Sequence, residues 1–193
     1  MGAVLVAAAM VLAGCTTDDG VDQVSTTTNP SATEQPGNPW DLPLEQRPPL
    51  FDPCEEIPIE AVEAGVGSGV EPDPELRIHQ PGELMSCAWM NNEVIFAVLS
   101  TWKSRSSYLD DTSYFASDVV VEDRGGLRMV RRADMGAHSC RQLFFTSQGT
   151  VFISVDMIGG LSSFKGINFV DPCDALEESL QGVLSFLPGG DFR

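Results

Sequence analysis

Four cysteines with two equal spacings constrain the fold of this chain more than any other feature. The interval from Cys54 to Cys87 equals the interval from Cys140 to Cys173. An even set of cysteines in an exported chain indicates disulfides, and three pairings are possible. The equal intervals favour Cys54–Cys87 with Cys140–Cys173. The sequence has no Cys-x-x-Cys pair, which zinc and redox sites commonly use, so we predict that all four are structural.

In each favoured pair, one cysteine belongs to the same three-residue motif, Asp-Pro-Cys. Asp52-Pro53-Cys54 and Asp171-Pro172-Cys173 both place Asp before Pro. Asp is a good N-cap, and Pro suits the first helical position. Each phrase therefore predicts a helix start with its cysteine in the first turn. Cys87 and Cys140 lie in strand-like segments, so each disulfide would link a helix to the sheet.

The amino-terminal residues are typical of an exported lipoprotein. An apolar run from Ala3 to Leu12 is followed by Ala13, Gly14 and Cys15. This run is too short to span a bilayer, which takes about 20 apolar residues, but it suits a signal-peptide core. Leu12-Ala13-Gly14-Cys15 resembles the bacterial lipobox. The resemblance implies a signal peptide at 1–14, a diacylglyceryl group on Cys15, and anchoring to the outer face of the cell membrane. No Lys or Arg precedes Cys15, so we expect the true start codon to lie upstream.

Residues 15–50 have the composition of a tether between this anchor and a domain. Thr, Pro and Asp dominate the segment, which buries too little apolar surface to offset its ordering entropy. We therefore predict a disordered, Thr/Pro-rich tether that begins at the lipidated cysteine. Large apolar side chains are rare in this segment, and they occur at Trp40, Leu42, Leu44 and Leu50. We expect the last few of these to pack onto the edge of the domain.

Paired β-rich segments around turn residues predict consecutive hairpins. Three such pairs occur: 84–90 with 94–101, 119–121 with 127–130 around Arg124-Gly125-Gly126, and 139–146 with 150–157. Helical spacing of apolar residues predicts helices after Pro53, within 108–115, and at the carboxyl end with Leu176 and Leu180. The sequence thus predicts one α+β domain over 51–193. It should have a mostly antiparallel sheet of about five to seven strands, two or three covering helices and two disulfides.

The net charge of −17, from 28 acidic and 11 basic residues, excludes some partners. Nucleic-acid binding is not expected, because such proteins need basic patches to replace phosphate counterions. The sequence also lacks catalytic, cofactor-binding and metal-binding patterns. His79 and His138 belong to no His-Glu-x-x-His motif. A Cys–His pair of Cys140 with His138 would require a free Cys140. We predict no catalytic residues, no cofactor and no metal.

The segment 158–170 is the candidate ligand or partner loop. It combines glycines with apolar residues and one cation, and the residues of interest are Leu161, Phe164, Lys165, Ile167 and Phe169. One interpretation is a loop that covers the edge of the core. The other is a lid over an apolar cleft, or a patch that meets a partner.

These features together resemble an actinobacterial lipoprotein family that is catalogued only as a domain of unknown function, number 3558. The resemblance is carried by the lipobox, the Thr/Pro tether, Asp52-Pro53-Cys54, Cys87-Ala88-Trp89 and Asp171-Pro172-Cys173. It covers about 52–187 and implies no catalytic residues. The chain is also similar in plan to extracellular sensor domains of actinobacterial Ser/Thr kinases, which implies ligand or partner binding in the envelope.

The resulting expectation is a non-enzymatic envelope lipoprotein, anchored to the membrane through Cys15, whose domain binds an envelope protein, a lipid or a glycan. Two alternatives stay open. One is an envelope hydrolase or other enzyme with its site under 158–170, which convergent polar residues in a cleft would favour. The other is an accessory subunit of a membrane complex, which a broad apolar surface patch would favour.

Overall fold

The structure is a computed structural model that describes residues 37–133, 138–160, 163–168 and 170–192. The segment predicted to be a signal peptide and Cys15 lie outside the described residues, as do Leu161 and Phe169 of the candidate loop. The compact unit runs from Pro36 to Arg193. It therefore begins earlier than the boundary at residue 51 that composition suggested, because residues 37–50 make specific contacts with the domain.

The fold is α+β, as expected, with an antiparallel sheet of eight strands in the order β1-β3-β4-β8-β7-β6-β5 and with β2 also paired to β3. The strands are β1 (Glu71–Pro72), β2 (Ile78–Gln80), β3 (Leu84–Met90), β4 (Val94–Thr101), β5 (Tyr114–Val121), β6 (Arg124–Arg131), β7 (Ser139–Thr146) and β8 (Gly149–Met157). The sheet exceeds the expected five to seven strands because the chain before β3 adds two short strands to one edge. A separate small hairpin joins β9 (Ser163–Phe164) to β10 (Ile167–Asn168).

The second predicted hairpin is confirmed, but its turn lies elsewhere. Glu122 and Asp123 form the turn between β5 and β6, and Glu122 has a positive φ of 56°. The expected turn residues Arg124-Gly125-Gly126 instead begin β6. Gly126 is needed inside the strand, because a Cβ there would lie 2.1 Å from the carbonyl oxygen of Leu143 on β7. This glycine therefore permits close strand pairing instead of a turn.

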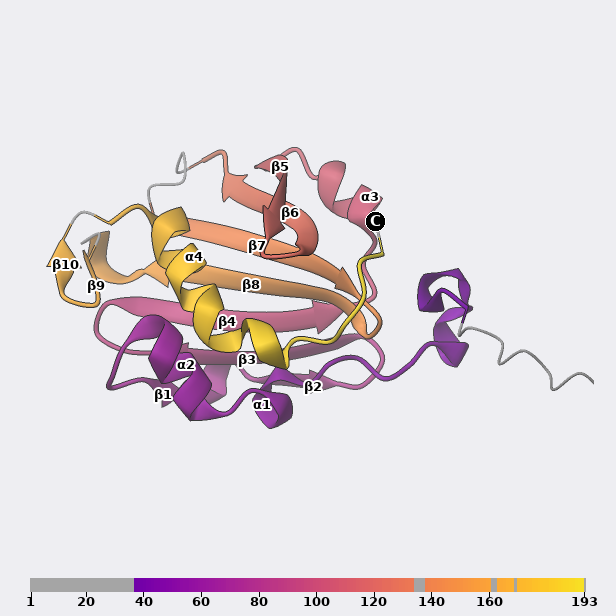
Figure 1. Cartoon of the computed structure of the whole chain (residues 1–193), viewed down its shortest axis with the longest axis horizontal. Coiled ribbons are helices and arrows are strands. Elements are labelled where there is room, and N and C mark those ends of the chain that lie inside the picture. Colours follow the sequence, from indigo (N-terminus) through magenta and orange to yellow (C-terminus); the bar gives the residue numbers. More distant parts are fainter. Residues whose placement is uncertain (1–36, 134–137, 161–162, 169, 193) are drawn as a thin grey trace, which may run out of the picture. The chain divides into compact units, whose positions relative to one another are not determined.

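Four helices accompany the sheet: α1 (Pro53–Glu56), α2 (Ile59–Val66), α3 (Arg105–Leu109) and α4 (Pro172–Val183). Figure 1 shows α2 and α4 side by side across one face of the sheet. The main core lies between them and the inward side chains of β3, β4, β7 and β8. The helices approach closely at two glycines, since a Cβ on Gly182 would lie 2.2 Å from the carbonyl oxygen of Ala61. Gly65 meets the backbone of Ser179 in the same way.

Both disulfides have the predicted pairing. Cys54 pairs with Cys87, and Cys140 pairs with Cys173, with Cα atoms 5.1 and 5.0 Å apart. Each Asp-Pro-Cys phrase starts a helix as expected. The carboxylates of Asp52 and Asp171 accept hydrogen bonds from the backbone N–H of the cysteine two residues on. Each disulfide thus joins the first turn of a helix to a strand of the sheet.

The opposite face of the sheet carries a smaller apolar cluster. It consists of Tyr108, Leu127, Met129, Leu143 and Phe145, with Trp40, Tyr114, Phe152 and Phe192 packed against it. Tyr108 comes from α3, which is shorter than the helix predicted within 108–115. Phe115 belongs to β5 instead, because the eight-residue pairing of β5 with β6 begins at Tyr114.

Candidate ligand-binding groove

The candidate loop forms the β9–β10 hairpin, which is held to the rest of the domain. Phe164 is buried in the main core and only 1% exposed. The ammonium group of Lys165 donates to the carboxylate of Glu178 on α4 at 2.8 Å and to the carbonyl of Ala64 at 3.3 Å. Ile167 is 63% exposed. The described part of the loop therefore closes the core edge with Phe164 and presents Ile167 to solvent.

Glu93, in the turn between β3 and β4, fixes the tip of this hairpin. Its carboxylate accepts hydrogen bonds from the hydroxyl of Ser163 and from the backbone N–H of Gly166. The Ser163 hydroxyl in particular holds the pKa of Glu93 below its ordinary value, and the Gly166 N–H acts in the same direction. A cavity of about 480 Å³ beside the hairpin is lined mainly by polar groups, namely Val66, Gly67, Ser68, Asn91, Asn92, Glu93, Lys165 and Gly166.

A second cavity combines aromatic walls with a polar rim, and we call it the aromatic groove. Its volume is about 430 Å³. It is lined by Asn38, Trp40, Asp41, Ser104, Arg105, Ser106, Leu109, Phe145 and Phe192. Small-molecule sites in proteins commonly measure about 300–1,000 Å³ and pair apolar walls with a few placed polar groups. The groove has both properties.

Trp40 forms one wall of the groove and is held by several contacts. Its indole N–H donates to the carbonyl of Thr146, at the end of β7, at 3.0 Å. Its ring meets Trp102 edge-on at 5.0 Å between centroids and Phe145 at 6.3 Å. The guanidinium of Arg47 lies 5.0 Å from the Trp102 ring and donates to the carbonyl of Trp40. These contacts order a segment whose composition alone suggested disorder.

The carboxyl-terminal segment also contributes to the apolar lining of the groove. β6 pairs with β7 only as far as Phe144, which leaves the last residues of β7 without a strand partner on that side. The chain end fills this place, because Phe192 donates its N–H to the carbonyl of Phe145 at 3.0 Å. The N–H of Ser147 in turn donates to the carbonyl of Gly189, and Arg124 donates to the carbonyl of Pro188. These bonds hold Phe192 in the lining of the groove.

The rim of the groove comes from α3 and the residue that precedes it. The Ser104 hydroxyl accepts a hydrogen bond from the N–H of Ser107 and so caps α3. Arg105 is partly exposed and donates to the carboxylate of Asp118 on β5 at 2.6 Å. Behind the rim, burial raises the pKa of Tyr108 to about 12, so this phenol stays neutral at physiological pH. Residues with hydroxyl, amide, carboxylate and guanidinium groups thus line the same cavity as the aromatic residues.

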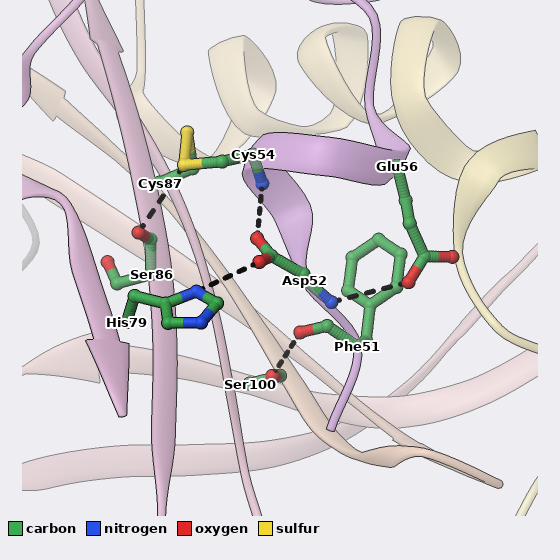
Figure 2. Close-up of polar contacts among 8 residues, drawn as sticks. All are labelled: Phe51, Asp52, Cys54, Glu56, His79, Ser86, Cys87 and Ser100. Atoms are coloured by element: carbon green, nitrogen blue, oxygen red, sulfur yellow. Dashed lines mark hydrogen bonds and ion pairs between the residues drawn. A yellow bond between two sulfur atoms is a disulfide. The ribbon is translucent and has the colours of Figure 1, made fainter. Parts of the chain in front are cut away.

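The histidines do not complete a catalytic arrangement within the part of the chain that is described. His79 Nδ1 lies 3.2 Å from Asp52, which also caps α1 (Figure 2). The nearby hydroxyls are engaged elsewhere, since Ser86 donates to the carbonyl of Leu76 and Ser100 donates to that of Phe51. The conditional Cys140–His138 pair fails because Cys140 is in a disulfide.

In 37–133, 138–160, 163–168 and 170–192, no three His, Cys, Asp or Glu side chains are grouped so that they could hold a metal ion. No helix among these residues is both long and apolar enough to cross a membrane.

Sequence reasoning missed the aromatic groove because its residues come from four separate segments. Residues 38–41, 104–109, Phe145 and Phe192 meet only in the folded domain. One signal was present in the sequence, because Trp40 is a large aromatic residue in a Thr/Pro-rich segment. A large apolar side chain in such a segment indicates a docking point.

A family model described as "Protein of unknown function (DUF3558)" matches residues 10–185. No curated protein and no solved structure matches the chain.

Proposed function

The chain belongs to that family of unknown function, and we propose that it is a lipid-anchored cell-envelope protein whose domain binds a ligand in the aromatic groove without catalysing a reaction. The anchor rests on the lipobox that ends at Cys15 and on the Thr/Pro-rich segment behind it. Binding rests on one observation, namely that Trp40, Phe145 and Phe192 line the same cavity as the polar groups of the rim.

The ligand class that we propose for the groove is a sugar residue of an envelope glycan. A pyranose or furanose ring has an apolar C–H face and a set of hydroxyls, which suits one aromatic wall and one polar rim. Asp41 can accept hydrogen bonds from hydroxyls, and Arg105 can donate to them. The strong negative charge of the chain disfavours an anionic lipid headgroup as the ligand.

A binding experiment tests the groove. Envelope oligosaccharides would be titrated into the full chain, with binding followed by calorimetry and by tryptophan fluorescence. Arg105→Ala should weaken binding about tenfold or more, because a hydrogen bond to a charged group contributes about 1.5–3 kcal/mol. Arg77→Ala, which removes an exposed cation on the other edge of the sheet, is the matched control. If no envelope oligosaccharide binds, or if both variants bind like the parent, the groove is not the site.

The anchor has its own test. Cys15→Ala removes the thiol that would carry the lipid, and the variant should appear in the soluble fraction of cells that retain the parent in the membrane fraction. Mass spectrometry of the parent should show acyl chains on the peptide that begins at Cys15. Continued membrane association of Cys15→Ala would contradict the lipoprotein assignment.

The enzyme alternative places a reaction in the polar cavity beside the β9–β10 hairpin. Glu93 and Lys165 are the charged groups of that cavity, and both are engaged within the fold. A general acid or base needs to reach a substrate proton, and these two groups are held by Gly166, Ser163 and Glu178. We therefore favour binding in the aromatic groove.

A further inference from the structure

The two edges of the main sheet differ in how they are protected. One edge is broken into β1, with two residues, and β2, with three, and Pro72 and Pro74 interrupt it. The other edge is β5, an unbroken strand of eight residues without Pro or Lys. Short strands, prolines and lysines are the devices that keep sheet edges from pairing with other chains. The β1–β2 edge has short strands and prolines, whereas β5 has none of the three devices.

The free backbone groups of β5 can be identified from its pairing with β6. The carbonyl of Ser113 accepts a hydrogen bond from the N–H of Arg132, so the odd-numbered residues of β5 face β6. The even-numbered residues then direct their N–H and C=O groups outward. Tyr114 already has partners for its outward groups. Its N–H donates to the carbonyl of Asp111, and its carbonyl accepts a hydrogen bond from the guanidinium of Arg132.

Three residues of the outer edge remain, namely Ala116, Asp118 and Val120. No residue that the structure describes forms a hydrogen bond with their backbone groups. Exposed apolar side chains accompany these free groups, since Phe115 is 49% exposed and Val120 is 66% exposed. An edge with free backbone groups and exposed apolar side chains is a template for strand addition.

We propose that this edge pairs with β5 of a second copy of the chain, in antiparallel orientation about an axis at Asp118. The three free residues are symmetric about Asp118, so two copies satisfy all of each other's free backbone groups in this register. Ala116 then lies opposite Val120 of the other copy, and Phe115 lies opposite Val121. Apolar pairs of this kind stabilise antiparallel strands.

The charges at the two ends of β5 also favour a second copy of the chain as the partner of this edge. Arg131 and Arg132 lie at one end of the β5–β6 ribbon, and Glu122 and Asp123 lie at the other. Antiparallel pairing brings the basic end of one copy to the acidic end of the other. The two Asp118 carboxylates meet at the axis, but each already accepts a hydrogen bond from Arg105 of its own copy at 2.6 Å. The central charges are therefore locally compensated.

A single strand-to-strand contact buries less area than the roughly 1,600 Å² of a standard stable interface, so the dimer should be weak and concentration-dependent. Sedimentation of the full chain over a range of concentrations tests this. The parent should show a dimer fraction that rises with concentration. Val120→Pro removes an outward N–H without touching the β5–β6 ladder and should sediment as a monomer, whereas Val120→Thr keeps the N–H and should still dimerise.

Cross-linking gives a second readout that does not depend on Val120. Asp118→Cys places two thiols on facing residues whose Cα atoms would be about 5.5 Å apart, within the range of a disulfide. In a Cys15→Ala background it should give a covalent dimer on mild oxidation. Glu83→Cys, on the turn before β3 at the other edge, should not. A parent that stays monomeric at every concentration, or equal cross-linking at both positions, would overturn the proposal.

Discussion

The carboxylate of Glu93 accepts a hydrogen bond from the backbone N–H of Gly166 at 3.0 Å, which joins the β3–β4 turn to the tip of the β9–β10 hairpin. The two residues are far apart in the sequence, and Glu93 also accepts a hydrogen bond from the hydroxyl of Ser163. One carboxylate therefore bonds to both Ser163 and Gly166, on either side of Phe164 and Lys165.

The first prediction concerns pH. The pKa of Glu93 is lowered from its ordinary value of 4.5, so its contribution to the free energy of unfolding is full above that value. The contribution is lost as the pH falls through the lower, folded-state pKa. Glu93→Gln should lower stability at neutral pH and flatten the loss of stability below about pH 4.5. Denaturant unfolding at several pH values measures this.

Glu83→Gln is the control for that experiment, because Glu83 is an exposed carboxylate on a different turn. Its unfolding curves should follow those of the parent at every pH. The assignment of Glu93 fails if Glu93→Gln retains the parent's full stability at neutral pH.

The second prediction concerns the contact between α2 and α4. Gly182→Ala should destabilise the domain by about 1–3 kcal/mol, because the added methyl group overlaps backbone atoms and the helices must move apart. The nearest of these atoms is the carbonyl oxygen of Ala61, at 2.2 Å from the Cβ position. Gly189→Ala is the control, since no atom lies within 4 Å of a Cβ at that position. Thermal unfolding of both variants tests this prediction. Equal melting temperatures for the two variants would contradict the close packing of α2 against α4.

The third prediction concerns Gln142, which is fully buried on β7. Neither its amide nitrogen nor its amide oxygen has a hydrogen-bond partner among the residues that the structure describes. A buried polar group without a partner costs about 1–3 kcal/mol. Gln142→Met keeps the approximate side-chain volume and removes both polar atoms, so it should raise the free energy of unfolding. A loss of stability instead would mean that a bound water satisfies the amide.

The fourth prediction concerns the disulfides. Both close loops with the same sequence separation of 33, so loop entropy alone gives each about 3–4 kcal/mol of stabilisation. The double variants Cys54→Ala/Cys87→Ala and Cys140→Ala/Cys173→Ala should therefore lose similar amounts. Equilibrium unfolding compares them. Peptide mapping without reduction should recover only these two cross-linked pairs, and any other pairing would contradict the structure.

Local signals in the sequence were sufficient for much of the fold. The Asp-Pro-Cys phrases located two helix starts, because a capping carboxylate and a proline act within one turn. Equal cysteine intervals identified the disulfide pairing, and paired β-rich runs identified three hairpins, although the turn of the second lies at Glu122 and Asp123. Each of these inferences uses residues that are close together or chemically unusual.

Features that depend on tertiary contacts could not be predicted from local sequence signals. Gly126 looked like a turn residue, yet its role is set by the approach of Leu143 from the neighbouring strand. Trp40 looked like part of a disordered segment, yet it is held by Thr146 and Trp102. The aromatic groove shares this difficulty, because Trp40 and Phe192 come from opposite ends of the domain sequence.

The disulfide between Cys54 and Cys87 also determines how the domain would bear mechanical load. A pull on the amino-terminal segment first acts on Trp40 and its neighbours and then reaches Cys54. From there the force passes through the sulfur atoms directly to Cys87 on β3. The residues between the two cysteines, including α2 and the divided β1–β2 edge, lie outside this covalent path. Tension applied to the amino-terminal segment would therefore reach the centre of the sheet through this disulfide, while α2 and the divided β1–β2 edge lie outside the shortest covalent path.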